Sequence, residues 1–154
     1  STLNSINKTK AIANYLYGLS KKGDVFALYG DIGVGKTTFA RYFINHATRI
    51  DHIPSPSYNI YFKYESSKAS IYHMDAWRID NDLEILNLGV LDFFQDSIFL
   101  VEWADKVDAY LPSNKLSITL EYNKSFRTIS LNGDASWKER LNKGLKRDLL
   151  EKLH

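Results

Sequence analysis

The chain has 154 residues, of which 44% are hydrophobic and 25% are charged, and its formal charge at pH 7 is +2. This length predicts a single domain over residues 1–154, and so small a charge is no argument for nucleic-acid binding by itself. Cysteine is absent and the four histidines lack zinc-ligand spacing, which excludes disulfides and thiolate metal sites and favours oxygen ligands for any metal. No export signal or apolar run of membrane-spanning length is visible, so we expect a cytoplasmic protein.

The first third of the chain predicts a helix, a strand and a second helix. Apolar residues at helical spacing indicate helices over residues 8–20 and 38–47, and residues 24–29 form a short apolar run of strand length. Between this strand and the second helix, the run from Gly30 to Thr37 fits the pattern G-x-x-x-x-G-K-[ST].

This pattern predicts a phosphate-binding loop. Glycines at positions 30, 33 and 35 permit positive φ and a close approach of backbone N–H groups to phosphate oxygens. The positive end of the following helix dipole adds to that attraction. We expect Lys36 to bridge the outer phosphate oxygens and Thr37 to ligate Mg²⁺, so the sequence predicts a nucleotide-binding protein.

The rest of the chain predicts two hairpins, a buried strand and a last helix. We first expect an extended proline-containing segment at 53–57, followed by an antiparallel hairpin from 58–65 and 70–75. A short helix over 81–87 and a strand at 98–101 come next. A second hairpin from 115–122 and 126–131 precedes a helix over 138–152. Residues 98–101 are all apolar, which is typical of a central strand buried on both faces. The predicted fold class is α/β, with a P-loop NTPase-like mixed sheet that contains antiparallel hairpins and is flanked by helices.

The last helix carries a local excess of positive charge. Residues 138–152 contain six Lys/Arg against three Asp/Glu, and Leu141, Leu145, Leu149 and Leu153 repeat every four positions. This predicts an amphipathic helix whose basic face is either solvated or in contact with RNA or a protein partner.

A phosphate loop needs a carboxylate as the second protein ligand of its metal, and two candidates lie at the ends of predicted strands. Glu102 follows the apolar run 98–101, and Asp75 follows the less apolar run 71–74. Both positions place a carboxylate where a strand emerges at the carboxyl edge of the sheet, beside the phosphates. The alternative is that each carboxylate simply meets solvent.

The surroundings of Asp75 offer further candidates. His73 and Asp75 lie on the same side of an extended chain, where they could share a phosphate or a water. Arg78 could then neutralise charge in the transition state, and the alternative is a surface hydrogen-bond network.

Two further pairs of residues are open to two interpretations. Trp77 and Trp103 more often indicate packing than ligand stacking. Ser55 and Ser57, in the proline-containing segment, are either turn residues or phosphate sensors.

Four segments, taken together in order and spacing, resemble the bacterial TsaE family, also called YjeE. They are the loop region 30–39, Ser-Pro-Ser-Tyr at 55–58, Tyr-His-Met-Asp-Ala-Trp-Arg at 72–78 and Leu-Val-Glu-Trp at 100–103. The resemblance runs from about residue 9 to residue 131, and the second and third segments are far more specific than the loop alone.

The resemblance implies a role for each matching residue. The residues that it assigns to nucleotide binding are Thr9, Asp31, Gly33, Val34, Gly35, Lys36, Thr37, Thr38 and Arg127. It assigns Mg²⁺ binding to Thr37 and Glu102, and catalysis to Lys36, Asp75 and Glu102. The residues that it places in nucleotide-sensing switch segments are Ser55, Ser57, His73, Arg78 and Trp103. The chain departs from the family pattern at Ser57, where threonine is usual, at Trp77, where tyrosine is usual, and at Val34, where alanine is usual. Val34 puts a bulkier group inside the phosphate loop.

The resemblance also implies a function. It predicts a Mg²⁺-dependent ATPase, slow in isolation, that works with the TsaD and TsaB proteins to install threonylcarbamoyladenosine in tRNA. A small-molecule kinase is the alternative, although 154 residues leave no evident acceptor domain. A GTP switch lacks the Asn-Lys-x-Asp run, because residues 114–117 end in serine. Whether the chain touches tRNA directly stays open.

Overall fold

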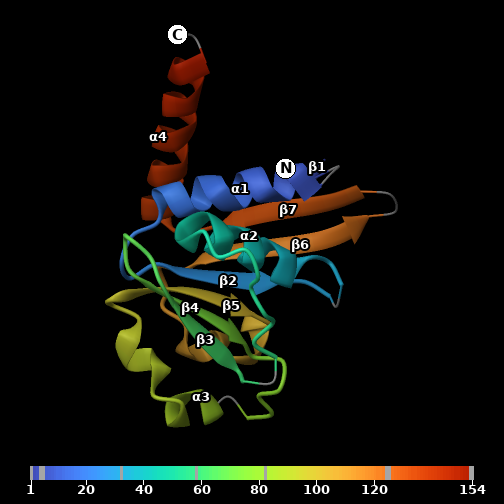
Figure 1. Cartoon of the computed structure of the whole chain (residues 1–154), viewed down its shortest axis with the longest axis vertical. Coiled ribbons are helices and arrows are strands. Elements are labelled where there is room, and N and C mark those ends of the chain that lie inside the picture. The colour runs from blue at the N-terminus through green and yellow to red at the C-terminus, as the bar shows by residue number, and fades with distance from the viewer. Residues whose placement is uncertain are drawn as a thin grey trace.

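The computed structural model describes residues 2–3, 6–31, 33–57, 59–81, 83–123 and 126–152. Within them the chain forms a seven-stranded sheet with helical elements on both faces (Figure 1). The predictions that involve Ile32, Tyr58 and Leu153 fall outside these residues, and so do the side chains of Leu145 and Leu149 on the last helix.

The sheet mixes parallel and antiparallel neighbours. In spatial order its strands are β1 (Thr2–Leu3), β7 (Phe126–Asn132), β6 (Leu116–Asn123), β2 (Val25–Tyr29), β5 (Ser97–Glu102), β4 (Ser70–Asp75) and β3 (Tyr61–Glu65). Strands β6, β2, β5 and β4 run parallel, whereas β3–β4, β6–β7 and β1–β7 are antiparallel pairs. The predicted mixed sheet with two antiparallel hairpins is confirmed.

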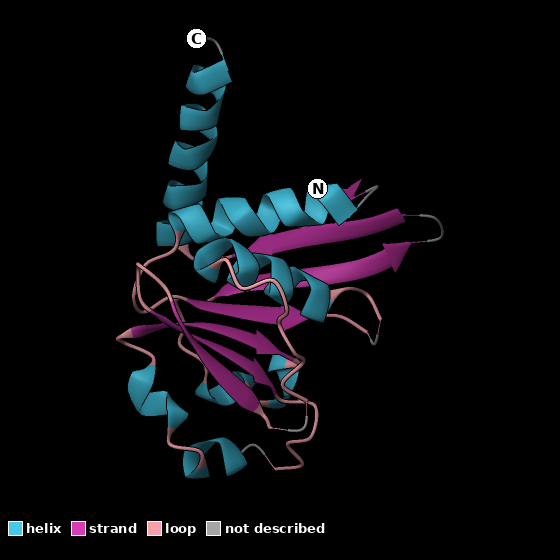
Figure 2. Ribbon diagram, viewed as in Figure 1, coloured by secondary structure: helices cyan, strands magenta, loops and turns pink. Residues whose placement is uncertain are grey.

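The two faces of the sheet are covered unequally. One face carries α1 (Ile6–Leu19) and α2 (Lys36–Thr48), which pack side by side (Figure 2). On the other face, the described residues form α3 (Glu84–Asn87) and three 3₁₀ turns, η1 (Val90–Phe93), η2 (Ala104–Lys106) and η3 (Asp108–Tyr110). The last helix, α4 (Ala135–Lys152), contacts α1 and then rises away from the body (Figure 1).

The central strands are buried on both faces, which explains their unbroken apolar sequences. In β2, Phe26 and Leu28 pack into the core under α1 and α2, whereas Val25 and Ala27 pack into the core under the short elements. Residues of β5 alternate between the same two cores. The interpretation of residues 98–101 as a central strand is therefore confirmed.

Several predicted boundaries differ from the structure. Helix α1 begins at Ile6 rather than at residue 8, and α3 covers only the last four residues of the helix predicted over 81–87. Strand β3 begins at Tyr61 rather than at residue 58, since Ile60 has a φ of 70° and cannot belong to an extended strand. Strand β1 and the 3₁₀ turns are not predicted, because elements of two to four residues are too short to show a period.

Helix α4 begins three residues before the predicted start at residue 138. Asp134 caps it, because its Oδ1 accepts the backbone N–H of Trp137 at 3.0 Å. Trp137 is buried in the core, and the Arg140 guanidinium binds both carboxylate oxygens of the buried Asp24 at 2.7–3.1 Å. These contacts fix the start of α4 against the entry to β2.

No helix within the described residues has both the length and the apolar character needed to cross a bilayer.

Candidate nucleotide site

The phosphate loop leaves β2 and ends at the first turn of α2. Gly30, Gly33 and Gly35 have φ values of 139°, 81° and 109°, which glycine adopts without strain. A Cβ atom at position 30 would lie 2.4 Å from the carbonyl oxygen of Leu120 and 2.8 Å from Cγ2 of Val34. Glycine is therefore required there by space as well as by backbone conformation.

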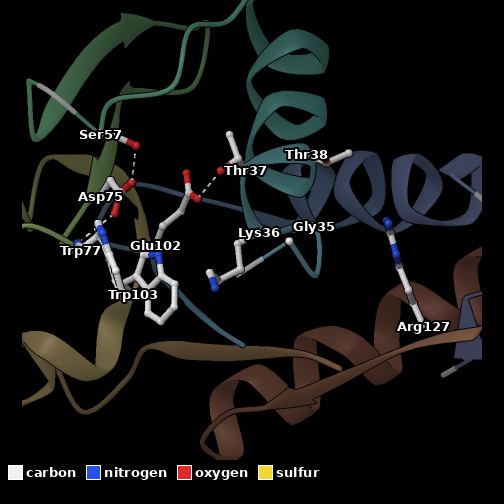
Figure 3. Close-up of a pocket in the computed structure, with 11 residues that line it drawn as sticks. Gly35, Lys36, Thr37, Thr38, Ser57, Asp75, Trp77, Glu102, Trp103 and Arg127 are labelled. Atoms are coloured by element: carbon white, nitrogen blue, oxygen red, sulfur yellow. Dashed lines mark hydrogen bonds between the residues drawn. The ribbon is translucent and has the colours of Figure 1, made fainter. Parts of the chain in front are cut away.

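A hollow of about 340 Å³ opens beside the loop at the start of α2. Its lining comes from the loop, α2, β7 and the carboxyl ends of β4 and β5, as Figure 3 shows. The described residues that line it are Gly33, Gly35, Lys36, Thr37, Thr38, Ser57, Asp75, Trp77, Glu102, Trp103 and Arg127. Ten of these eleven residues belong to the site predicted from the sequence, and Trp77 is the exception.

The Lys36 ammonium is held by the loop's own backbone. Nζ donates hydrogen bonds to the carbonyl oxygens of Gly30 and, at 3.0 Å, Asp31, and it lies 3.7 Å from the centre of the Trp103 ring. Burial lowers the pKa of Lys36, while the nearby carboxylate of Glu102 opposes this shift. The charge of Lys36 is therefore placed inside the pocket before any phosphate arrives.

The two expected metal ligands meet directly. The Thr37 hydroxyl donates to Oε1 of Glu102 at 2.5 Å, although the two residues are 65 positions apart. Among the described residues no group of three or more His, Asp or Glu side chains could hold a metal alone. A hydroxyl and one carboxylate are oxygen donors that suit Mg²⁺, whose remaining ligands in such sites are phosphate oxygens and water. The donor set therefore fits Mg²⁺ that arrives with a nucleotide.

His73 contacts the carboxylate of Glu102. Its Nε2 lies 2.6 Å from Oε2 of Glu102, and its side chain has no exposed surface. His73 and Asp75 share one side of β4, and the phosphate or water that they could share stays a prediction. Glu102 is 2% exposed and Asp75 is 5% exposed. This burial excludes the alternative that these two carboxylates simply meet solvent, and the alternative that Asp75 belongs to a hydrogen-bond network on the surface.

Asp75 connects the proline-containing segment to the pocket. Its Oδ2 accepts a hydrogen bond from the Ser57 hydroxyl at 2.9 Å, and its Oδ1 accepts the backbone N–H of Trp77 at 2.9 Å. Ser57 in turn lies 2.8 Å from the hydroxyl oxygen of Ser55. The two serines are therefore linked to the pocket carboxylate, and their role as sensors stays a prediction.

Several predicted residues do not line this pocket. Thr9 is buried on α1, Ser55 and Arg78 are exposed outside the pocket, and Asp31 and Val34 border a separate hollow along β6. The Val34 side chain is 6% exposed and packs in the core. Its extra bulk relative to alanine is thus accommodated in the core, while the binding roles of these residues stay predictions.

Trp77 is the pocket residue that sequence reasoning missed. Its ring packs against the ring of Trp103 with 4.4 Å between the ring centres, and Trp77 is 44% exposed and lines the hollow, so packing and ligand stacking both stay predictions. Its position two residues after Asp75, the carboxylate at the end of β4, was the available signal.

Comparison with known proteins decides the family. The family described as "Threonylcarbamoyl adenosine biosynthesis protein TsaE" matches residues 3–129. The chain belongs to the TsaE family. A Bacillus subtilis TsaE protein is 36% identical over 115 residues, which cover 74% of this chain and 72% of the relative. A Rickettsia felis TsaE protein is 33% identical over 138 residues, which cover 87% of this chain and 81% of the relative.

The fold agrees with that of a solved bacterial structure. The crystal structure of Bacillus subtilis YdiB superposes with a TM-score of 0.78 at 28% identity, and covers 96% of this chain and 94% of the other. The predicted resemblance to TsaE and the predicted P-loop NTPase-like fold class are therefore both confirmed.

Proposed function

We propose that this TsaE protein binds ATP with Mg²⁺ in the hollow beside the phosphate loop and hydrolyses the ATP slowly on its own. The contact between the Thr37 hydroxyl and the Glu102 carboxylate carries the proposal. It brings the first turn of α2 to the end of a buried strand, which is how P-loop proteins place the two protein ligands of Mg²⁺. When bound, the metal would neutralise charge that develops on the phosphate oxygens.

Lys36 supplies the positive charge for the phosphates. Its ammonium already lies in the pocket, and it would exchange the carbonyl oxygens of Gly30 and Asp31 for phosphate oxygens. The backbone N–H groups at the start of α2 would hold the same phosphates.

Asp75 is placed to orient the attacking water. Its carboxylate lines the pocket on the side of Glu102, and Ser57 and the backbone of Trp77 hold it in position. A carboxylate there would accept a proton from water as the water oxygen bonds to the γ-phosphorus and the bond to the β–γ bridging oxygen breaks, which releases ADP.

The position of the pocket's arginine supports slow hydrolysis. Figure 3 places Arg127 on the far side of Gly35 from Asp75 and Glu102. An arginine that stabilises the transition state, supplied by the chain or by a partner, is worth about 10³–10⁵ in rate. We therefore infer that a partner completes the site.

We further propose that the reaction serves threonylcarbamoyladenosine modification of tRNA, with TsaD and TsaB as the partners. Membership in the TsaE family supports the pathway, as do the printed names of the Bacillus and Rickettsia relatives, which are tRNA threonylcarbamoyladenosine biosynthesis proteins. Switch segments around Ser57 and Asp75 would transmit the nucleotide state to the partners.

The test is reconstitution with TsaD and TsaB from the same organism. We expect phosphate release to rise when all three proteins are mixed, and repeated rounds of threonylcarbamoyladenosine formation to require this chain. Lys36→Ala, assayed in parallel, should support neither. Equal product formation without this chain would overturn the tRNA-modification role, and a phosphorylated small molecule in place of free phosphate would establish a kinase.

A further inference from the structure

The carboxylate of Glu102 is held from two sides. Thr37 on α2 contacts Oε1 at 2.5 Å, and His73 on β4 contacts Oε2 at 2.6 Å. His73 has no exposed surface and Glu102 is 2% exposed, so bulk water does not compete for the contact between them. A short hydrogen bond to a buried carboxylate fixes the carboxylate plane as well as its position.

We propose that His73 is a positioning residue that orients Glu102 for Mg²⁺. Its Nε2–H holds Oε2, which leaves Oε1 directed toward Thr37, where the metal is expected. This inference rests on the proposed binding of Mg²⁺ and ATP, and it assigns His73 a role toward the metal ligand instead of toward the phosphates. Hydrogen-bond partners of metal ligands typically change metal affinity by about 10–100-fold.

The other ring nitrogen supports this direction of the hydrogen bond. Nδ1 of His73 is buried and has no hydrogen-bond partner among the described residues. A carboxylate oxygen can only accept, so the hydrogen shared in the 2.6 Å contact comes from Nε2, and a neutral ring then leaves Nδ1 without a hydrogen that would need an acceptor. The ring hydrogen therefore belongs on Nε2, where it is donated to Glu102.

The position of the pair in the sheet explains why the contact is specific. In the parallel β4–β5 ladder, Asp75 pairs with Glu102 and His73 pairs with Leu100. His73 thus lies one step before the pocket on the same face as both carboxylates, too deep to reach a nucleotide and within reach of Glu102.

The experiment compares two amide substitutions that differ by one methylene. Glutamine places its side-chain NH₂ near the position of histidine Nε2, whereas asparagine is too short to reach Glu102. ATP binding to the wild type, His73→Gln and His73→Asn would be measured by calorimetry in EDTA and across a Mg²⁺ titration. Thermal unfolding in EDTA would check each fold.

The expected result is a selective loss of metal dependence. His73→Asn should need about 10–100-fold more Mg²⁺ for half of the metal-induced gain in ATP affinity, while its affinity in EDTA stays within about twofold. His73→Gln should lie within about threefold of the wild type. An unchanged Mg²⁺ requirement in His73→Asn, or equal losses in both variants, would overturn the role of His73.

The failure of the proposed function has a different signature. If the wild type binds ATP with no gain from Mg²⁺, or binds no ATP, then the metal site itself is wrong and the positioning role is overturned with it. If only the His73 variants depart from expectation while the wild type binds Mg²⁺ and ATP, then the proposed function stands and this inference alone falls.

Discussion

At the scale of single residues, Lys36 combines burial with a full set of contacts inside the pocket. It is 4% exposed, it donates to two loop carbonyls, and it lies over the face of Trp103. These contacts hold the ammonium inside the pocket. Because these contacts are made within the phosphate loop, we expect the removal of Lys36 to affect nucleotide binding more than folding.

Lys36→Ala should abolish measurable ATP binding. Two charge-assisted hydrogen bonds to phosphate at about 1.5–3 kcal/mol each correspond to a loss of about 100-fold or more in affinity. Calorimetry would measure the binding, and circular dichroism the fold. Lys63→Ala, which removes an exposed lysine on β3, is the matched control and should bind ATP like the wild type. Wild-type affinity in Lys36→Ala would refute the site.

Substitutions of the pocket carboxylates Glu102 and Asp75 should have different effects, because we assign the two residues different roles. Glu102→Gln should raise the Mg²⁺ requirement by about tenfold or more, because a metal ligand is worth at least as much as its hydrogen-bond partner. Asp75→Asn should lower turnover by about 10²-fold and leave nucleotide affinity nearly unchanged, because a water-orienting base acts mainly in the transition state. Phosphate release and ATP binding across a Mg²⁺ titration would measure both. The reverse pattern would mean that the roles are exchanged.

At the scale of elements, contacts between distant parts of the chain hold helix ends in place. The Lys68 ammonium donates to the carbonyl oxygens of Tyr17, Gly18 and Ser20 at the end of α1. Arg140 holds α4 against β2 by binding Asp24 with two nitrogens. Asp24 is 4% exposed, and burial raises its pKa even though the charge of Arg140 acts in the opposite direction.

Arg140→Leu should destabilise the protein by about 3–5 kcal/mol at neutral pH, because it leaves a buried carboxylate without its partner. Without the arginine, the pKa of Asp24 in the folded state should rise further. A raised folded-state pKa contributes stability below the unfolded-state pKa of about 3.9, and this stability is lost as the pH rises through the folded-state pKa. The deficit should thus be smaller near pH 4 than near pH 7.

Urea unfolding at several pH values would measure this deficit. The double variant Asp24→Asn with Arg140→Leu removes the buried charge and should recover much of the loss. Lys143→Leu is the control on the same helix, because its exposed pair with Glu139 is worth less than about 0.5 kcal/mol. A deficit of Arg140→Leu that does not change with pH would contradict an ionised, unpaired Asp24.

At the scale of the whole molecule, the pocket joins parts that are far apart in the sequence. It brings together the loop after β2, the ends of β4 and β5, the first turn of α2 and Arg127 on β7. A ligand that contacts all of them binds the folded state and not the unfolded chain. Such binding stabilises the entire domain rather than one element.

ATP with Mg²⁺ should therefore raise the melting temperature. ATP at 100 times its Kd adds about 2.7 kcal/mol, which for a domain of this size corresponds to a rise of about 5–11 °C. EDTA should reduce the rise, and Lys36→Ala should show none. Scanning calorimetry would measure it, and an equal rise in Lys36→Ala would indicate that ATP binds elsewhere.

The sequence by itself determined the elements and the core of the site. The spacing of glycines before Lys36 and Thr37 predicts a phosphate loop, because glycines permit positive φ values directly beside a lysine and a hydroxyl. The apolar run before Glu102 predicts a strand buried on both faces, and β5 is such a strand. Both features are local, because the spacing of apolar residues and the residue types of a turn can be recognised from neighbouring positions in the sequence.

Only the tertiary structure decided which side chains meet. His73 and Glu102 are 29 positions apart, Thr37 and Glu102 are 65 apart, and Asp24 and Arg140 are 116 apart. The first pair depends on the β4–β5 register that puts Asp75 beside Glu102, the second on β2 lying next to β5, and the third on the packing of α4 against the entry to β2. Helical and strand periods show which face a residue occupies but not which strand lies next to it, because strand order is set by packing across the whole sheet.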